Sequence, residues 1–209
     1  MEMLKEISEA LQEGNLKVVT DLVPKALEQG ISAKDVLEKG LLDGMSVVGE
    51  KFKNNEVYVP EVLIAARAMN GGAALLKSAL AGEGVQSKGT VVLGTVKGDL
   101  HDIGKNLVRM MMEGKGLNVV DIGIDASAEK FIEHAKAENA RVIACSALLT
   151  TTMSEMKHVV EAAKAAGIRD DVKIMVGGAP VTEQFCQSIG ADLYAPDAAS
   201  AADEAAKAF

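Results

Sequence analysis

Apolar side chains in the N-terminal part of the chain recur at steps of three and four residues, which is the spacing of one face of an α-helix. Leu4, Ile7 and Leu11 share such a face, and residues 18–26 carry a second one. Glycines, which can end a helix, follow both stretches. The pattern predicts two amphipathic helices at the start of the chain.

Two further helices are predicted before residue 81. Ser32 can accept the hydrogen bond of an N-cap, and it precedes apolar residues at helical spacing over 33–48. Pro60 suits the first turn of a helix, and a helical pattern follows it as far as Leu80. The N-terminal part is therefore predicted to be a four-helix bundle.

A polar, glycine-rich stretch follows the bundle. Residues 81–89 read "AGEGVQSKG", a composition that is typical of a linker. We place the boundary inside it, with a helical cap domain at 1–84 and a second domain at 85–209.

Short apolar runs alternate with helical patterns in the second domain. The apolar runs are 90–96, 117–123, 141–148, 173–179 and 191–195, and the helical patterns lie near 104–115, 127–139, 152–166, 181–189 and 198–207. This alternation predicts the α/β class, with a doubly wound, Rossmann-like parallel sheet of five strands. Ligands of such sheets bind beyond the carboxyl ends of the strands.

The charge balance narrows the function classes. Lys and Arg number 22 against 30 Asp and Glu, so the net charge is −8. An acidic chain of this kind is a poor match for nucleic acid or for an anionic membrane surface. No apolar run approaches the roughly 18 residues of a membrane span. Two widely separated cysteines and the absence of a signal-like N-terminus favour a reducing, cytoplasmic location.

The loop after the first predicted strand carries the candidate chemistry. The segment "GTVKGDLHDIGKNL" has glycines at 94, 98 and 104, a spacing that fits neither a dinucleotide fingerprint nor a Walker A loop. Asp99 and Asp102 would also repel a phosphate. A phosphate site is therefore not expected here.

A histidine between two aspartates suggests an imidazole whose tautomer is held. If a carboxylate accepts from one ring N–H, the other nitrogen of His101 is free as a Lewis base. A conventional zinc site needs three or four protein ligands, and His134 and His158 lie on predicted helices elsewhere. A lone histidine suits a metal whose other positions are occupied by a macrocycle.

Simpler interpretations stay open for each of these residues. His101 can be a surface histidine bonded to Asp99 or Asp102. Ser146 and the threonines at 150–152 can cap a helix, and the glycines at 177–178 can form a plain turn.

Three segments in order carry a family resemblance. "GDLHDIGKNL" resembles the D-x-H-x-x-G motif of cobalamin-binding domains, "SALLTTTM" at Ser146–Met153 resembles their S-x-L segment, and "GGAP" at Gly177–Pro180 resembles their paired glycines. The stretch "DGMSVVGEKFKNNEVYVPEVLIAARAMN" is similar to their helical cap. The chain thus resembles the corrinoid proteins of anaerobic methyltransferase systems and the cobalamin-binding module of methionine synthase.

This resemblance implies a ligand to cobalt and its support. His101 would coordinate cobalt from below and displace the cofactor's own benzimidazole base. Asp99 would hold His101, and Thr152 would complete the relay with a hydroxyl where methionine synthase has serine. Asp102 and Gly104 belong to the same motif and are expected in the cofactor site.

The displaced tail of the cofactor would enter a slot beside the sheet. The resemblance places Ser146, Leu148 and Thr150 along it and leaves room for it at Gly177 and Gly178, since glycine lets a ligand approach the backbone. Three more contacts are expected: Ala198 on the tail, and Tyr58 and Met69 on the cap side. The helical spacing of Met69 fits a core position equally well.

The resemblance implies a methyl carrier and not an enzyme that acts alone. The cofactor would be cobalamin as its Co(I), methylcobalamin or hydroxocobalamin form. One partner would be a substrate-specific methyltransferase, and another a corrinoid:tetrahydrofolate or corrinoid:coenzyme M methyltransferase. A reductive activase would restore Co(I). The chain itself shows no acid, base or substrate pocket beyond the cofactor site.

Two alternatives belong to other classes. A cobalamin-binding sensor shares the cap and the sheet but normally adds a DNA-binding module, and no basic segment of that kind is seen. The small subunit of a cobalamin-dependent mutase uses a different cap.

Overall fold

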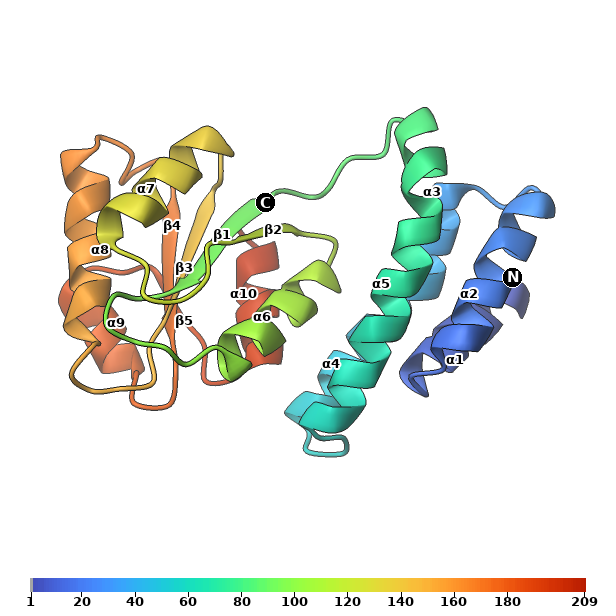
Figure 1. Cartoon of the computed structure of the whole chain (residues 1–209), viewed down its shortest axis with the longest axis horizontal. Helices are drawn as coiled ribbons and strands as arrows, with labels where there is room; N and C mark the ends of the chain where they lie inside the picture. Colours follow the sequence, from blue (N-terminus) through green and yellow to red (C-terminus); the bar gives the residue numbers. More distant parts are fainter. Residues whose placement is uncertain (1) are drawn as a thin grey trace. The chain divides into compact units, whose positions relative to one another are not determined.

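A computed structural model describes residues 2–209 and divides the chain into two compact units (Figure 1). The first contains residues up to Ser87 together with Gly114–Gly116, and the second contains Lys88–Glu113 and Leu117–Phe209. Among the described residues, no helix is both long and apolar enough to cross a membrane.

The first unit consists of helices. They are α1 (Glu2–Gln12), α2 (Leu16–Glu28), α3 (Ala33–Asp35), the π-helical segment η1 (Val36–Leu42), α4 (Asp43–Lys53) and α5 (Val59–Gly82). Their core includes Ile7, Leu11, Leu41 and Leu76, all fully buried. On α2, the predicted face is buried at Val23 and Ala26, whereas Val18 is exposed.

The third predicted helix is longer and less regular than expected. Ser32 caps its start, because its hydroxyl accepts from Asp35 N at 3.0 Å. The helix then widens into η1 and continues to Lys53, five residues beyond the predicted end at 48. Gly40 within η1 lies against Ile7, and a Cβ there would come within 3.2 Å of the Ile7 side chain. The periodicity could not reveal the π-helical turn, because apolar positions stay on one face through it.

The start of the predicted linker is helical. Helix α5 extends to Gly82, past the predicted end at Leu80. The Glu83 carboxylate accepts from Ala33 N at 2.8 Å and from Lys34 N at 3.0 Å, so residue 83 is also held. The turn at Gly84, with φ +68°, is the first backbone that leaves the helix.

The second unit is the predicted doubly wound sheet. Its five parallel strands are ordered β2-β1-β3-β4-β5. The strands are β1 (Thr90–Thr95), β2 (Asn118–Asp121), β3 (Val142–Ser146), β4 (Lys173–Gly177) and β5 (Leu193–Tyr194). The helices are α6 (Ile103–Glu113), α7 (Ala128–Ala137), α8 (Ser154–Ala165), α9 (Glu183–Ile189) and α10 (Ala198–Ala206).

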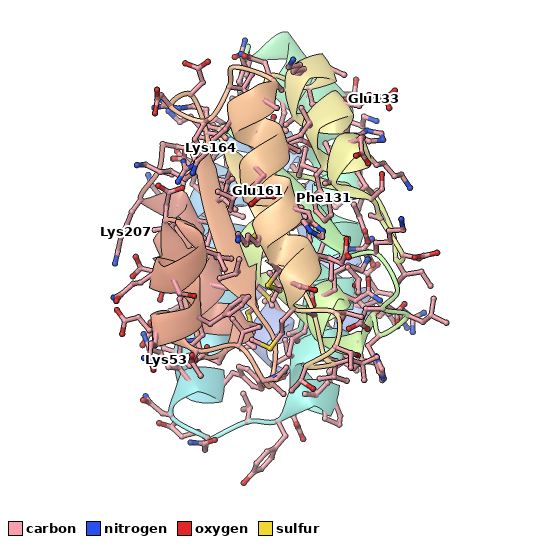
Figure 2. The ribbon with its side chains drawn as sticks, turned by 90° about the vertical axis from the view of Figure 1, so that its left-hand side faces the viewer. Lys53, Phe131, Glu133, Glu161, Lys164 and Lys207 are labelled. Carbon is pink, nitrogen blue, oxygen red and sulfur yellow. The ribbon has the colours of Figure 1, made fainter. Side chains whose placement is uncertain are left out.

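Helices cover both faces of the sheet. Figure 1 shows α7, α8 and α9 against one face and α6 and α10 against the other. Phe131 of α7 and Met156 of α8 are fully buried on the first face, together with Ile143 of β3. Figure 2 looks onto this layer, with Glu161 and Lys164 on the solvent side of α8 and Glu133 on α7. The two-sided burial explains the continuous apolar runs of the strands.

Candidate functional site

The loop after β1 holds Asp99 and His101 at the carboxyl edge of the sheet. The backbone of Asp99 is fixed, because its N donates to Val96 O at 3.1 Å and its O accepts from Asp125 N at 3.1 Å. The side chain of Asp99 is completely buried. Gly98 precedes it with φ +79°, a conformation that favours glycine.

Asp99 binds His101 through one carboxylate oxygen. Oδ1 accepts from His101 N at 3.1 Å and lies 2.7 Å from His101 Nδ1. An ionised carboxylate can only accept, so Nδ1 carries a hydrogen, and in the neutral ring Nε2 keeps its lone pair. The sequence D-x-H therefore folds into a local turn that fixes both the ring and its tautomer.

The other oxygen of Asp99 is held by the segment after β3. Oδ2 accepts from Leu148 N at 2.8 Å, from Leu149 N at 3.2 Å and from the Thr152 hydroxyl at 2.8 Å. Thr152 Oγ1 lies 2.9 Å from Leu149 O as well. Its single hydrogen therefore has two acceptors, the Asp99 carboxylate and a backbone carbonyl.

These contacts determine the charge of the carboxylate. Burial alone would raise the pKa of Asp99, but the hydrogen bonds from His101, Leu148 and Thr152 outweigh it and lower the pKa well below its ordinary value. Asp99 is therefore an anion at neutral pH. The imidazole of His101 therefore faces a fixed negative charge at Nδ1.

The imidazole itself is accessible. The His101 side chain is 50% exposed, although its carboxylate partner is completely buried. Across residues 2–209, Nε2 of His101 makes no hydrogen bond to the protein. The same residues contain no group of three or more His, Cys, Asp and Glu that is arranged to hold a metal ion. His101 therefore presents one free nitrogen without further protein ligands beside it.

The paired glycines lie at the end of β4 and have different surroundings. Gly178 has φ +133°, and a Cβ there would lie 1.8 Å from Ala147 O. A Cβ on Gly177 would meet Ala195 O at 3.6 Å, an ordinary contact. Gly178 is thus required by the fold, whereas the protein itself tolerates a side chain at Gly177.

Exposed apolar side chains surround this edge of the sheet, and the sequence patterns did not single most of them out. Leu100 and Ile103 flank His101 and are 68% and 75% exposed, and Ile124 and Leu149 are exposed in the loops after β2 and β3. Leu148, the one that was predicted, is exposed beside Leu149. Apolar residues inside polar loops were the available signal. Exposed apolar side chains gathered in this way mark a ligand-binding or interaction surface.

Asp125 was also missed. Its carboxylate accepts from Gly98 N at 2.7 Å, so it fixes the start of the histidine loop from the segment after β2. Its φ of +49° places it in the left-handed region, which Asp tolerates better than most residues. No local sequence pattern links positions 98 and 125.

The other predicted residues occupy varied positions. Asp102 bonds Asn106 at the start of α6, Gly104 is exposed with open space around it, and Ser146 ends β3. Thr150 is exposed in the turn before α8, and Ala198 is buried at the first turn of α10. In the helical unit, Met69 is buried in the core of the bundle, and the Tyr58 side chain, before α5, is exposed.

Comparisons with known proteins agree on one family. Two family models, both described as a B12 binding domain, match residues 89–205 and residues 3–77. A corrinoid protein of Desulfitobacterium hafniense is 40% identical over 99% of this chain and 97% of its own length. A dimethylamine corrinoid protein of Methanosarcina barkeri is 43% identical over 98% of this chain and 96% of its own length.

A solved structure supports the same assignment. The methanol:cobalamin methyltransferase complex of Methanosarcina barkeri contains a chain that superposes with a TM-score of 0.88 at 32% identity. The match covers 97% of this chain and 77% of that one. The sequence motifs, the five-stranded sheet with its helical unit and these relatives converge: the chain belongs to the corrinoid proteins of methyltransferase systems, the family with B12 binding domains.

Proposed function

We propose that this protein carries a methyl group on cobalamin, with His101 as the lower axial ligand to cobalt. The observation that carries the proposal is the imidazole of His101, which is fixed through Nδ1 at 2.7 Å by a buried anionic Asp99. Its Nε2 makes no hydrogen bond to residues 2–209, and its side chain is 50% exposed. When bound, cobalamin supplies a cobalt centre that can accept a methyl group and release it to a second acceptor.

The residues at the edge of the sheet fit a corrinoid. Leu100 and Ile103 offer exposed apolar surface beside the histidine in the segment after β1, and Leu149 offers it in the loop after β3. A Cβ added at Gly177 would make only one ordinary contact, at 3.6 Å, so the space there suits a bulky group passing close to the backbone. Ser146, Leu148, Thr150 and Gly178 border the same edge, where we expect the nucleotide tail.

The chain's own residues orient and tune the axial ligand. Asp99 keeps the hydrogen on Nδ1, so Nε2 stays a base directed away from the carboxylate. Thr152 donates to Asp99 or to Leu149 O, because both acceptors lie within 2.9 Å of its hydroxyl. A change of charge at the imidazole can therefore be answered by rotation of one hydroxyl. Asp102, by contrast, would act through its hydrogen bond to Asn106 at the start of α6. Gly104 would leave open space for the cofactor at the edge of the sheet.

The partners follow from the family. The relatives include a dimethylamine corrinoid protein and a chain in a methanol:cobalamin methyltransferase complex. These names support a carrier over a sensor. We infer a substrate-specific methyltransferase as methyl donor and a second methyltransferase, acting on tetrahydrofolate or a thiol coenzyme, as acceptor. A reductive activase would return the cobalt to Co(I), and Tyr58, Met69 and Ala198 remain proposed cofactor contacts.

The test is axial ligation in purified protein. Wild type and His101→Ala are loaded with hydroxocobalamin, and their visible spectra are compared. His158→Ala is the matched control, because His158 is also exposed and also bonded to a carboxylate, Glu155, at 3.2 Å. We expect the spectrum to change in His101→Ala alone. Identical spectra for His101→Ala and wild type would refute the proposal.

A further inference from the structure

His101 is held at its backbone as well as at its ring. The Thr95 hydroxyl donates to the carbonyl oxygen of His101 at 2.8 Å, and Thr95 is completely buried at the end of β1. The backbone of Thr95 is itself fixed, because its N donates to Gly123 O at 2.9 Å and its O accepts from Ala126 N at 3.0 Å. The hydroxyl therefore has a defined position from which to hold the loop.

The segment that fixes Thr95 is anchored by a buried ion pair. Asp121, at the end of β2, accepts from Gly123 N at 2.9 Å through Oδ1. The same carboxylate receives the ammonium of Lys105, at 2.6 Å from Oδ1 and in contact with Oδ2. Lys105 is only 3% exposed, and this partner compensates its buried ammonium. Arg109 adds a second cation 3.7 Å from Asp121 Oδ2.

Lys105 connects this anchor back to the histidine loop. It lies in the first turn of α6, four positions after His101, and its ion pair ties that turn to the end of β2. The loop from Gly98 to Asp102 is thus bounded by Thr95 on one side and by Lys105 on the other. Neither residue contacts Asp99 or Thr152 by any hydrogen bond found among residues 2–209.

We propose that Thr95 is a positioning residue for His101, with the Lys105–Asp121 pair as the anchor of its frame. Asp99 fixes the orientation and tautomer of the imidazole ring, and Thr95 fixes the position of the backbone that carries the ring. Removing the Thr95 hydroxyl takes this donor from the carbonyl of His101 and loosens the loop. This inference rests on the proposed role of His101 as axial ligand.

The variant that tests it is Thr95→Val, which keeps the shape of the side chain and removes the hydroxyl. Thr95→Ser restores the hydroxyl and is the rescue variant. Thr90→Val is the matched control on the same strand, because Thr90 Oγ1 accepts only from Asn118 at 3.2 Å, at the opposite end of β1.

The first readout uses the protein without cofactor. Amide hydrogen exchange of peptides that cover residues 97–103 should quicken about three- to tenfold in Thr95→Val, the factor that one hydrogen bond contributes. Thr95→Ser and Thr90→Val should match wild type. Unchanged exchange in Thr95→Val would overturn the proposal. If Thr95→Val does not fold, Lys105→Met is the second variant, because it removes the buried charge and keeps the volume of the side chain. Amide exchange of the same peptides should be faster in Lys105→Met, and unchanged exchange would likewise overturn the proposal.

The second readout detects the axial ligand. The protein is made with ¹⁵N-labelled histidine, loaded with cobalamin and reduced to Co(II). Electron paramagnetic resonance then shows doublet splitting from a ¹⁵N imidazole and triplet splitting from the ¹⁴N of the cofactor's own base. We expect doublets in wild type, Thr95→Ser and Thr90→Val. In Thr95→Val we expect a smaller fraction of doublets, because the equilibrium constant for His101 binding to cobalt should be about three- to tenfold smaller.

The two readouts separate two kinds of failure. Doublets of equal intensity in wild type and Thr95→Val would sink the positioning role while leaving His101 as ligand. Triplets in wild type would sink the proposed function, and the exchange of the cofactor-free protein would still decide whether Thr95 holds the loop.

Discussion

At the scale of single residues, the site depends on which donors bind each of the two carboxylate oxygens of Asp99. One oxygen serves the backbone N and the ring of His101, and the other serves two backbone amides and the Thr152 hydroxyl. A buried anion of this kind is stable only because all its donors are in place. The carboxylate is therefore both a structural centre of the loops and the partner of the imidazole.

Asp99→Asn should disturb both roles. An amide has one acceptor oxygen, so it cannot serve the imidazole and the amides of Leu148 and Leu149 together. We expect a loss of about 1–3 kcal/mol in the free energy of unfolding, the usual cost of unsatisfied buried groups. Chemical denaturation of the cofactor-free protein measures it. Asp125→Asn keeps the one acceptor oxygen that Gly98 N needs and should cost less.

The stability of the cofactor-free protein should also depend on pH through Asp99. Its pKa is lowered from the ordinary 3.8, so the carboxylate is protonated at a lower pH in the folded state than in the unfolded state. The stabilisation is complete above about pH 4 and is lost as pH falls through the folded-state pKa. The gap in unfolding free energy between wild type and Asp99→Asn should narrow below pH 4. A gap that stays constant down to about pH 2 would contradict this origin.

The two glycines should respond differently to the same methyl group. Gly178→Ala forces a Cβ to 1.8 Å from Ala147 O at φ +133°, and we expect it to destabilise the protein by more than about 2 kcal/mol. Gly177→Ala meets only an ordinary contact at 3.6 Å and should leave thermal stability nearly unchanged. We expect Gly177→Ala to weaken cobalamin binding instead, measured by titration. Unimpaired binding in a stable Gly177→Ala protein would count against a cofactor slot there.

At the scale of elements, helix termini are fixed by side chains from distant segments. Ser32 caps α3 locally, but the first two amides of the same helix are bound by Glu83 from the end of α5. Glu83 thereby joins the end of α5 to the start of α3. Beyond Glu83, the turn at Gly84 still closes on α5, because Val85 N donates to Leu80 O at 3.1 Å.

Glu83→Ala should loosen the start of α3 and the end of α5 together. Loss of a capping carboxylate typically costs about 1 kcal/mol. We expect faster amide exchange in residues 33–36 and 79–83, read by mass spectrometry. Glu28→Ala, at an exposed glutamate near the end of α2, is the matched control and should not change these peptides. Equal exchange in both variants would show that the cap contributes nothing.

At the scale of the whole molecule, two compact units are joined by a short polar segment. The segment that we propose as a hinge is Gly84–Lys88, shorter than residues 81–89 because α5 and Glu83 hold its beginning. We propose that motion at this hinge lets partner enzymes reach the cofactor.

Shortening Gly84–Lys88 by three residues should slow methyl transfer more than it weakens cofactor binding. The physical reason is that binding uses residues within the second unit, whereas the proposed transfer to partner enzymes would also use motion at the hinge. Stopped-flow spectra with a partner methyltransferase and equilibrium titration with cobalamin measure the two effects. Equal losses in both would argue against a hinge.

The sequence by itself determined the parts of the fold that follow from the periodicity of its apolar residues. Alternating apolar runs placed all five strands, and the order of the motifs identified the family, because these signals are local. The turn Asp99-x-His101 is also local, since its two contacts join residues two positions apart.

Only the tertiary structure decided which distant residues complete the site. Thr95, Lys105 and Asp125 act on the histidine loop through partners that lie elsewhere in the chain. The π-helical turn and the Glu83 cap depend likewise on packing between helices. Buried polar groups must bind whichever partners the fold brings near them. A local sequence pattern does not show which distant residues come together.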